Sequence, residues 1–418
     1  MNKKKESKVV PNVRFKGFTD DWKQRKLNEV LSFLKDGTHG THADDENGPL
    51  LLSAKNIKNG KIICDETDRR ISEEEYEKIH TNFSLEVGDV LLTIVGSIGE
   101  TAILKDCSSI TFQRSVAFLR PNGTITSDFL YSEIQTQKFQ NELDSRKSTS
   151  AQPGIYLGDL SEVPIVFTTN LDEQAKIGDY FNNLDHLITL HQQKITLLTK
   201  LKKAMLEKMF PKKGTVIPEF RFNGFANAWE QHKLGEVGKC QSGIGFPDVE
   251  QGGKTGTPFY KVSDMNNYGN EQEMTCANNY VTDEQIVRKN WKPITEVPAV
   301  IFAKVGAAIM LNRKRLCRFP FLLDNNTMAY KFGEKWDTNF GKTIFEKIDL
   351  TKLVQVGALP SYNATDVENL DIKMPIDINE QKVIGEFFAN LDNLITLHQR
   401  KIDMLKKLKS ACLSEMFI

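Results

Sequence analysis

Three short patterns place chemically competent side chains at the spacings that known sites use. The first, GGKT at Gly252 to Thr255, has the ending of a phosphate-binding loop. Such a loop needs another glycine five residues before Gly253, and that position holds Asp248. Because the missing glycine removes the turn that lets backbone amides surround a phosphate, we predict that this stretch does not bind ATP.

The second pattern is a pair of histidines, His39 and His42, whose spacing would let two imidazoles share one metal ion. No third ligand is apparent, and Gly40 between them indicates a loop. The six cysteines are scattered without a CxxC pair, so neither a zinc site nor a disulfide framework is suggested. We therefore predict no metal site and no cofactor in this chain.

The third pattern, Asp377, Glu380 and Lys382, has the spacing of a nuclease signature. An almost identical stretch occurs earlier in the chain, but there Ala175 replaces the lysine. In both stretches the glutamate, Glu173 or Glu380, stands three residues after a helix-capping side chain and can complete a capping box. We interpret the glutamates as capping groups and predict no catalytic residues.

These two stretches, 173–210 and 380–417, are each predicted to form one long amphipathic helix. Mostly apolar residues recur at alternating steps of four and three, as in a coiled coil. About 38 residues at a rise of about 1.5 Å give a helix about 57 Å long, which is typical of a spacer. The predicted seam comprises Leu184, Ile188, His191, Ile195 and Leu198, and then Leu391, Ile395, His398, Ile402 and Leu405.

Each seam is interrupted by a histidine and, farther along, by a lysine, Lys202 or Lys409. These polar residues could fix the register of the helix pair, or the lysines could extend their charged ends into water. A neighbouring apolar face, which includes Leu197 and Met404, makes the apolar stripe wider than a seam requires. It could dock partner subunits or pack on the chain's own domains.

The whole chain is a tandem repeat with an offset of 207 residues. The motif PxxRFxGFxxxW occurs at Pro11 and again at Pro218, and the helices start at 173 and 380. Each middle region has apolar, strand-like runs separated by Gly and Asn turns, such as 110–119, and helix-like stretches, such as 129–143, which predicts mixed α/β domains. We expect a disordered basic tail (1–10), a first domain (11–168), a helix with linker (169–217), a second domain (218–375) and a second helix (376–418).

Composition indicates a soluble protein of more than one domain. The chain has 418 residues, 39% of them apolar, and lacks both a membrane-length apolar run and the apolar core of a signal peptide. We therefore expect a cytoplasmic location. The formal net charge is zero, so a nucleic acid would have to meet clustered basic residues or be held partly by a partner.

The repeated motif, the doubled helix that begins with Glu and Gln, and the paired variable domains resemble one known family. This family is the DNA-specificity subunit of type I restriction-modification systems. The carrying residues are Pro11, Arg14, Phe15, Gly17, Phe18 and Trp22, their repeats Pro218, Arg221, Phe222, Gly224, Phe225 and Trp229, and the pairs Glu173–Gln174 and Glu380–Gln381. The resemblance covers nearly the whole chain.

The resemblance implies a non-catalytic subunit with two target-recognition domains, each reading one half of a split DNA sequence. It implies that the helices form an antiparallel coiled coil with pseudo-twofold symmetry, set the spacing, and dock two methyltransferase subunits. S-adenosylmethionine would belong to those partners, and ATP and Mg to the restriction subunits. The bases read and the gap between half-sites do not follow from the sequence.

Candidate base readers are the polar residues in the variable loops, because Arg, Lys, Asn, Gln and Asp make the common contacts to base edges. In the first domain they are Lys35, Thr38, His39, Asn56, Lys58, Gln113, Arg114, Arg146 and Lys147. In the second they are Ser242, Lys261, Asp264, Asn266, Arg313, Arg315, Asn325, Asn326, Tyr362 and Asn363. The basic run from Arg313 to Arg318 suggests a grip on phosphates.

Two other functions stay open at this point. An autonomous DNA-binding regulator would bind duplex DNA tightly without partners, which the zero net charge disfavours. A stand-alone nuclease would cut DNA as the purified chain with magnesium.

Overall fold

The computed structural model describes residues 10–81, 83–148, 153–354 and 360–418. The predicted basic tail lies almost entirely outside these ranges, as does the end of the loop that follows Lys147. The chain divides into two compact units, each described by itself below. Unit 1 contains Met1–Gln192 and Gln399–Ile418, and unit 2 contains Gln193–His398.

Unit 1 is built on a four-stranded antiparallel sheet in the order β2-β9-β6-β7. Its strands are β1 (Lys23–Lys26), β2 (Leu31–Asp36), β3 (Leu50–Leu52), β4 (Ile57–Lys58), β5 (Lys61–Ile62), β6 (Val90–Thr93), β7 (Thr101–Ile103), β8 (Ile110–Phe112), β9 (Val116–Pro121) and β10 (Pro164–Phe167). Its helices are η1 (Leu27–Val30), η2 (Ala54–Asn56), α1 (Glu73–His80), α2 (Ser127–Ile134), α3 (Gln137–Ser145), α4 (Leu157–Ser161) and the start of α5 (Leu171–Lys208).

Unit 2 repeats this plan with a sheet in the order β12-β18-β15-β16. Its strands are β11 (Glu230–Lys233), β12 (Gly238–Ser242), β13 (Thr257–Tyr260), β14 (Tyr280–Val281), β15 (Ala299–Ala303), β16 (Lys314–Cys317), β17 (Leu322–Leu323), β18 (Thr327–Phe332) and β19 (Asp371–Met374). Its helices are α6 (Leu234–Val237), η3 (Asp248–Glu250), η4 (Val262–Asn266), α7 (Asp283–Lys289), η5 (Ala307–Leu311), α8 (Thr338–Lys347), η6 (Leu350–Leu353), α9 (Ala364–Glu368) and the start of α10 (Ile378–Met416).

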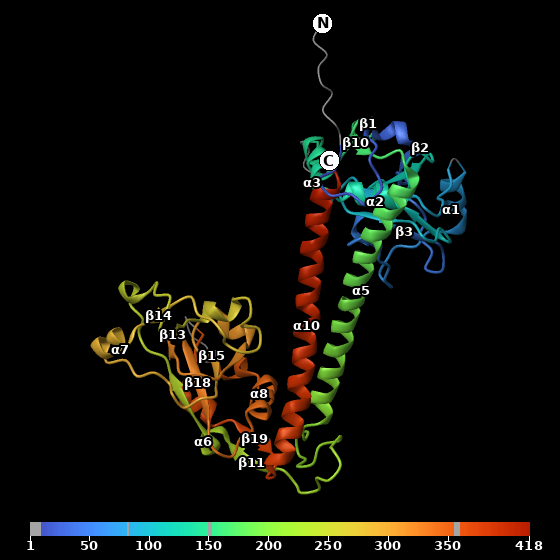
Figure 1. Ribbon diagram of the computed structural model, residues 1–418. Coiled ribbons are helices and arrows are strands. Elements are labelled where there is room, and N and C mark those ends of the chain that lie inside the picture. The colour runs from blue at the N-terminus through green and yellow to red at the C-terminus, as the bar shows by residue number, and fades with distance from the viewer. Residues whose placement is uncertain (1–9, 82, 149–152, 355–359) are drawn as a thin grey trace. The chain divides into compact units, whose positions relative to one another are not determined.

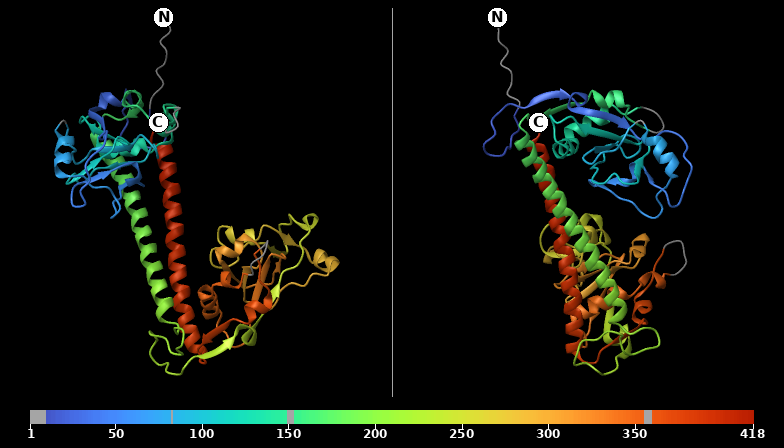
Figure 2. Two further views of the ribbon diagram at one scale, coloured as in Figure 1. Left: turned by 180° about the vertical axis from the view of Figure 1, so that it is seen from behind. Right: turned by 90° about the vertical axis from the view of Figure 1, so that its right-hand side faces the viewer.

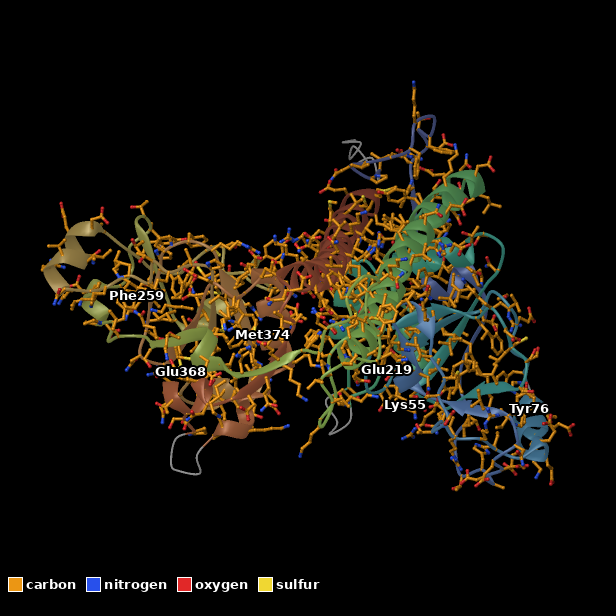
Figure 3. All side chains as sticks on the ribbon, turned by 90° about the horizontal axis from the view of Figure 1, so that it is seen from below. Lys55, Tyr76, Glu219, Phe259, Glu368 and Met374 are labelled. Carbon is orange, nitrogen blue, oxygen red and sulfur yellow. The ribbon has the colours of Figure 1, made fainter. Side chains whose placement is uncertain are left out.

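Both sheets are covered on two faces, which explains why their central strands are continuously apolar. In β6 all four residues are buried, and in β15 all five. Val90 and Leu92 face α2 and α5, whereas Leu91 faces the small layer that holds β3 and β8. In unit 2 Phe259 of β13, labelled in Figure 3, belongs to the layer outside the main sheet. The predicted mixed α/β fold is confirmed.

Two details differ from the sequence-based expectation. The predicted helical stretch near 129–143 is two helices, because Thr136 caps α3 by accepting a hydrogen bond from the Phe139 amide. The long strand-like run at 110–119 is likewise two strands, β8 and β9, separated by the turn that contains Gln113 and Arg114. In each case a local cap or turn interrupts an apolar pattern that looks continuous in sequence.

The helices α5 and α10 span 38 and 39 residues, as the repeat predicts. In unit 1 the beginning of α5 runs beside the end of α10, and in unit 2 the end of α5 runs beside the beginning of α10 (Figures 1 and 2). Phe181 meets Phe417 at 5.8 Å between ring centroids, and Phe210 meets Phe388 at 6.0 Å. Rising residue numbers on one helix meet falling numbers on the other, so the pairing is antiparallel in both units.

The predicted seam is found at the helix contact. Leu184, Ile188, Leu198, Leu391 and Ile402 are buried. The other predicted seam residues are half-buried: His191, Ile195, Ile395, His398 and Leu405. The seam therefore joins the two helices and also contributes to the core of each unit, which contains Leu184 in unit 1 and Leu391 in unit 2.

Within the core of unit 1, Glu133 of α2 is almost fully buried, and one carboxylate oxygen has no hydrogen-bond partner among the described residues. Burial raises the pKa of Glu133 from 4.5 to about 8. The caps Thr126 and Asp337 occupy matching places in the two units, which makes Ile344 the counterpart of Glu133. An apolar side chain therefore fills this site in unit 2.

We predict that Glu133→Gln stabilises unit 1 and that this gain in stability grows as the pH rises. The folded-state pKa lies above the unfolded one, so the contribution of Glu133 to the stability of the wild-type unit is fully present below about pH 4.5 and is lost as the pH rises to about 8. At about pH 8 the variant should gain on the order of 4 kcal/mol in free energy of unfolding, with little gain near pH 4. Hydrogen exchange measures this in unit 1, and unit 2 of the same chain is the control. An equal gain at both pH values would contradict it.

Candidate DNA-recognition surfaces and the helix pair

A buried arginine–glutamate pair ties the N-terminal motif of each repeat to its long helix. In unit 1 the Arg14 guanidinium donates to both carboxylate oxygens of Glu173, at 2.5 and 2.8 Å. In unit 2 Arg221 donates to Glu380 at 2.6 and 2.7 Å. The hydrogen bond to the glutamate raises the pKa of each arginine, and both carboxylates are buried. Two motifs that lie far apart in sequence thus form one contact.

This contact corrects the predicted capping box. Asn170 caps α5 by accepting from the amides of Asp172 and Glu173, but the Glu173 side chain turns to Arg14 instead of reaching back. The pattern at Asp377, Glu380 and Lys382 is resolved in the same way. Glu380 is buried against Arg221 while Lys382 is exposed, so the three side chains do not form a nuclease site.

The glutamine next to each glutamate fastens the globular domain to the helix start. Gln174 accepts a hydrogen bond from the Thr126 amide at 2.7 Å, just before α2, and donates to the Thr168 carbonyl. Gln381 accepts from the Asp337 amide at 2.9 Å, just before α8, and donates to the Pro375 carbonyl. In both units the glutamate therefore holds the N-terminal motif, and the glutamine holds the globular domain, against the start of the long helix.

The two lysines of the seam cross to the opposite helix. Lys409 of α10 contacts both carboxylate oxygens of Asp185 on α5, at 2.6 and 2.7 Å. Lys202 of α5 contacts Asp392 on α10 at 2.5 Å. Only 12% and 15% of these lysine side chains are exposed, so the alternative that they extend into water is wrong. Each pair fixes the register of one helix against the other.

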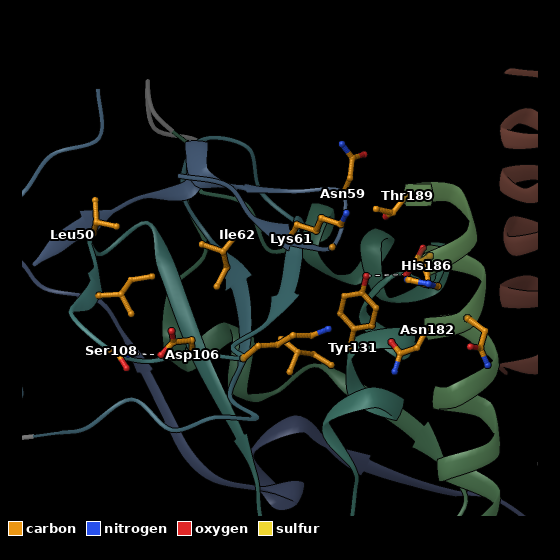
Figure 4. A pocket seen from close by; sticks show the side chains of 16 residues that line it. Leu50, Asn59, Lys61, Ile62, Asp106, Ser108, Tyr131, Asn182, His186 and Thr189 are labelled. Atoms are coloured by element: carbon orange, nitrogen blue, oxygen red, sulfur yellow. Dashed lines mark hydrogen bonds between the residues drawn. The ribbon is translucent and has the colours of Figure 1, made fainter. Parts of the chain in front are cut away.

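One short helix of each domain, α2 in unit 1 and α8 in unit 2, also contacts these pairs. In unit 1 the Tyr131 hydroxyl donates to Asp185 at 3.0 Å (Figure 4), and Gln135 accepts from Lys409 at 2.6 Å. In unit 2 Lys342 donates to Asp392 at 3.0 Å, and the counterpart of Gln135, Glu346, pairs with Lys202. Each aspartate is therefore bound both by the opposite helix and by its own domain. The first site uses neutral groups where the second uses a charged pair.

The predicted recognition residues of the first domain, apart from Asn56 and Lys58, lie on elements that meet at one end of the main sheet. The strand β2 ends here, and the Thr38 amide bonds to the Phe112 carbonyl at 2.8 Å. The Arg114 amide returns a bond to the Thr38 carbonyl at 3.0 Å. A Cβ on Gly37 would lie 2.2 Å from the Phe112 carbonyl oxygen, so only glycine permits this approach. The loop after β2 and the turn before β9 form one surface, here called the first reading edge.

Further loops extend this surface. The Ile94 amide, after β6, bonds to the Ser115 carbonyl at 2.9 Å, and the Ile155 amide, before α4, bonds to the Ile94 carbonyl at 2.9 Å. The Ser148 amide bonds to the Gly154 carbonyl at 2.9 Å, which brings the segment after α3 to the same place. Lys35, Thr38, His39, Gln113, Arg114, Arg146 and Lys147 all lie on these elements.

Unit 2 has the same surface, the second reading edge. The Ile244 amide, after β12, bonds to the Leu323 carbonyl at 2.8 Å, and a Cβ on Gly243 would lie 1.8 Å from the Asp324 carbonyl oxygen. The Lys304 amide, after β15, bonds to the Asn326 carbonyl at 2.9 Å. The predicted residues on the elements of this edge are Ser242, Lys261, Asn266, Arg313, Asn325, Asn326 and Asn363.

The exposure of the candidates separates them into three groups. The exposed ones are His39, Lys58, Arg114, Lys147, Ser242, Asn266, Asn325, Asn326 and Asn363. The half-buried ones are Lys35, Thr38, Gln113, Arg146, Lys261, Arg313 and Arg315. The buried ones are Asn56, Asp264 and Tyr362. Lys58 lies away from the first reading edge, on the β4–β5 hairpin, whose Gly60 pairs with Ala102 of β7.

The three buried candidates have structural hydrogen bonds, which argues against the prediction that they contact bases. Asn56 donates to the Ile63 carbonyl and to Asp68. Asp264 accepts from the amides of Lys261 and Asn278 and so holds a turn together. The Tyr362 hydroxyl donates to the Ala303 carbonyl at 2.5 Å. These polar side chains stabilise turns inside their own domains.

In the basic run from Arg313 to Arg318, fewer side chains are available to contact phosphates than the sequence predicts. Lys314 turns inward to the Ile348 carbonyl, and burial lowers its pKa to about 8. Burial lowers the pKa of Arg315, whereas Arg318 is paired with Glu273 at 2.9 Å. Arg313 remains at the second reading edge, where it donates a hydrogen bond to Asn266.

The phosphate-loop and metal patterns are not sites in the described part of the chain. The Tyr280 amide donates to the Gly253 carbonyl at 3.0 Å, and the segment leads into the strand β13, not into a helix. His39 contacts Asp36, whereas His42 contacts Glu75, so the two histidines do not converge. No group of three or more His, Cys, Asp or Glu side chains among the described residues could hold a metal ion.

Sequence reasoning missed two features of these edges. Tyr156 is 71% exposed at the start of α4, where the second repeat places Asn363. The alignment of 150–165 with 357–372 makes the two residues equivalent, and this equivalence is the signal that identifies Tyr156. The other feature is the turn η5, whose exposed apolar residues are not among the polar residue types considered as base readers.

The second apolar face of the helices is exposed. Leu197 and Met404 are 60% and 63% exposed, the largest values on this face. Its other members are also exposed: Leu187, Leu190, Leu201, Leu394, Leu397 and Leu408. Packing against the chain's own domains, one of the two alternatives, therefore does not cover this face within either unit. No helix of the described residues is long and apolar enough to cross a membrane.

Comparison with known proteins agrees with this geometry. The family model for the type I restriction modification DNA specificity domain matches residues 19–200 and again 227–407. The chain belongs to this family. The two matches begin 208 residues apart and end 207 apart, so each covers one repeat, with its domain and most of its long helix.

One curated relative matches nearly the full length of the chain, and another matches just over half of it. A putative type I restriction enzyme MjaX specificity subunit of Methanocaldococcus jannaschii is 23% identical over 93% of this chain and 91% of its own. The type I restriction enzyme MjaVIII specificity subunit of the same organism is 27% identical over 57% of this chain and 58% of its own. Among solved structures, the type I restriction-modification S subunit from M. genitalium has a TM-score of 0.68 at 14% identity, covering 98% of this chain and 99% of that one.

We predict that Lys409→Met weakens the helix contact of unit 1 by about 1 to 3 kcal/mol, because Asp185 keeps its charge without its partner. Asp185→Asn in the same chain should recover part of that loss. The four-variant cycle, measured by hydrogen exchange of unit 1, gives the coupling energy. Lys406→Met, on the exposed side of the same helix, is the matched control. A coupling energy near zero would show that the pair does not hold the register.

Proposed function

We propose that the chain is the DNA-specificity subunit of a type I restriction-modification complex and acts without catalysing a reaction itself. The observation that carries the proposal is the paired reading edge. Two domains share one scaffold and one sheet order but present different polar residues at the same end of the sheet. A protein that reads two different half-sites needs such a pair, and the family membership of both repeats supports it.

Each domain reads one half of a split target in this proposal. The first edge offers His39 and Arg114, and the second offers Asn325, Asn326 and Asn363, all exposed. Arginine is suited to guanine and asparagine to adenine in the major groove, so the two edges favour different letters. The domain boundaries used here, 11–168 and 218–375, remain those expected from the repeat.

The long helices connect and space the two readers. Each helix begins in one unit and ends in the other, so its length sets how much chain separates the domains. The exposed face around Leu197 and Met404 docks two methyltransferase subunits, and restriction subunits join that core. S-adenosylmethionine binds in the methyltransferase partners, and ATP and Mg bind in the restriction partner. The complex acts on DNA in the cytoplasm.

A solved chain of a type I restriction-modification system, described for its complex assembly and conformational transition, has the same fold. Its TM-score is 0.51 at 17% identity, with 95% of this chain and 97% of that one covered. This similarity supports the proposed fold of a subunit that works inside an assembly. The partners themselves follow from the exposed helix face and from the family.

Replacing residues 238–372 with the same region of another family member is predicted to change one half of the methylated sequence. The other half should keep its letters, because the first reading edge is built only from residues of unit 1. Genome-wide mapping of modified adenines in cells that carry the hybrid measures both halves. The reciprocal replacement in the first domain is the matched control. Alteration of both halves by one replacement would contradict the proposal.

Leu197→Asp, or Met404→Asp in the other helix, is predicted to weaken methyltransferase docking more than folding. Both side chains are mostly exposed, so the charge costs little in the free chain but would be buried in the complex. Co-purification with tagged methyltransferase subunits, with a melting curve of the free chain, separates the two effects. Val287→Asp, an exposed apolar residue on α7, is the control. Capture at wild-type stoichiometry would count against the docking face.

A further inference from the structure

The turn η5 of the second domain presents two apolar side chains to solvent. It joins β15 to β16, and within it Met310 is 62% exposed and Leu311 57% exposed. We call these two residues the apolar tip. Large apolar side chains on a short, exposed turn are not explained by the packing of unit 2, because neither belongs to its core.

The apolar tip lies at the second reading edge. The strand pairs Ala303 with Thr327 and Phe302 with Lys314 show that β15 ends, and β16 and β18 begin, at the same end of the sheet. The Gly306 amide, directly before η5, bonds to the Pro360 carbonyl at 2.8 Å. The tip is thus next to elements that carry Asn326 and Asn363.

The turn is anchored, so the tip is held in place. Ile309, between the two flanks of the turn, is 2% exposed and packs in the core of unit 2. Asn312 ends the turn in the left-handed conformation, at φ 48°. Its side-chain oxygen accepts from the Leu350 amide at 3.0 Å and from the Lys314 ammonium at 2.7 Å. Met310 and Leu311 are therefore held exposed to solvent by a turn whose own residues are buried or hydrogen-bonded.

The first domain lacks this feature at the equivalent place. Its β6–β7 connection runs through Gly96, Ser97 and Gly99, and it carries no exposed large apolar side chain. It is also shorter, because Thr93 and Thr101 flank it where Ala303 and Lys314 flank the turn in unit 2. The two reading edges therefore differ in chemistry as well as in sequence at this position.

We propose that Met310 and Leu311 are specificity-determining residues that contact thymine methyl groups in the half-site read by the second domain. The inference rests on the proposed function. The C5-methyl of thymine is the apolar group that a base pair presents in the major groove, where it is read by apolar side chains. Methionine adapts to such a contact because its side chain is unbranched and polarizable.

The surroundings of the tip favour DNA over a protein partner. Arg313 follows the tip directly and donates to Asn266, while Asn325 and Asn326 form the neighbouring turn. A protein interface would extend the apolar area over a few hundred Å². Two apolar residues among cationic and amide groups instead match a base edge bordered by phosphates.

The test uses the full chain in complex with its methyltransferase subunits and a duplex that contains its mapped target. Each thymine of the half-site assigned to the second domain is replaced in turn by deoxyuridine, which lacks only the methyl group. At least one replacement should weaken binding about fourfold, the effect of one buried methyl group. The double variant Met310→Ala with Leu311→Ala should bind the thymine and uracil duplexes equally.

Two controls make the result specific. Replacements in the half-site of the first domain should have the same effect on the variant as on the wild type. Val287→Ala, exposed on α7, should keep the full dependence on the thymine methyl. A wild-type complex that tolerates every replacement would overturn the inference, as would a double variant that keeps the fourfold loss. A complex that binds its mapped target no better than random duplex would instead overturn the proposed function.

Discussion

The structure depends on a partly buried aspartate at the same place in each repeat. Asp185 and Asp392 each accept a lysine from the opposite helix and a donor from the short helix of their own domain. A carboxylate shielded from water must have its charge compensated, so the helix register and the seating of the domain cannot change independently. The arginine–glutamate pair and the glutamine beside it add the same kind of constraint at the helix start. Together these contacts make a rigid scaffold, and the variable loops can change without disturbing it.

The separation between a shared scaffold and variable loops explains how one fold carries two different sets of exposed loop residues. The loops of each edge are linked by backbone hydrogen bonds, such as those of Thr38 with Phe112 and of Lys304 with Asn326. Backbone bonds do not depend on side-chain identity, so the exposed residues can vary without loss of the fold. Glycines at 37 and 243 preserve the close approach in both domains. The polar residues Asn56, Asp264 and Tyr362 are buried, and their side chains form hydrogen bonds inside their own domains.

The candidate site shows where reading a sequence succeeds and where it stops. Loop composition located most elements of both edges, because base readers and turn formers are the same polar residue types. Loop composition could not distinguish Asn325, whose side chain is exposed, from Asn56, whose side chain is buried and forms hydrogen bonds inside the domain. It also missed Met310 and Leu311, because only polar residue types were considered as base readers and an apolar residue does not show in the sequence whether a turn exposes it.

The sequence by itself determined the repeat, the two long helices, the α/β character of the domains and the family. These follow from periodicity and from an offset of 207 residues, which are properties of the chain and need no contact to be known. Only the tertiary structure decided the partners of Glu173, Lys202 and Lys409, and it replaced helix capping and solvent exposure by ion pairs. The physical reason is that a charged side chain has several favourable partners of similar energy. Which one it takes depends on burial and on groups brought close by segments far away in sequence.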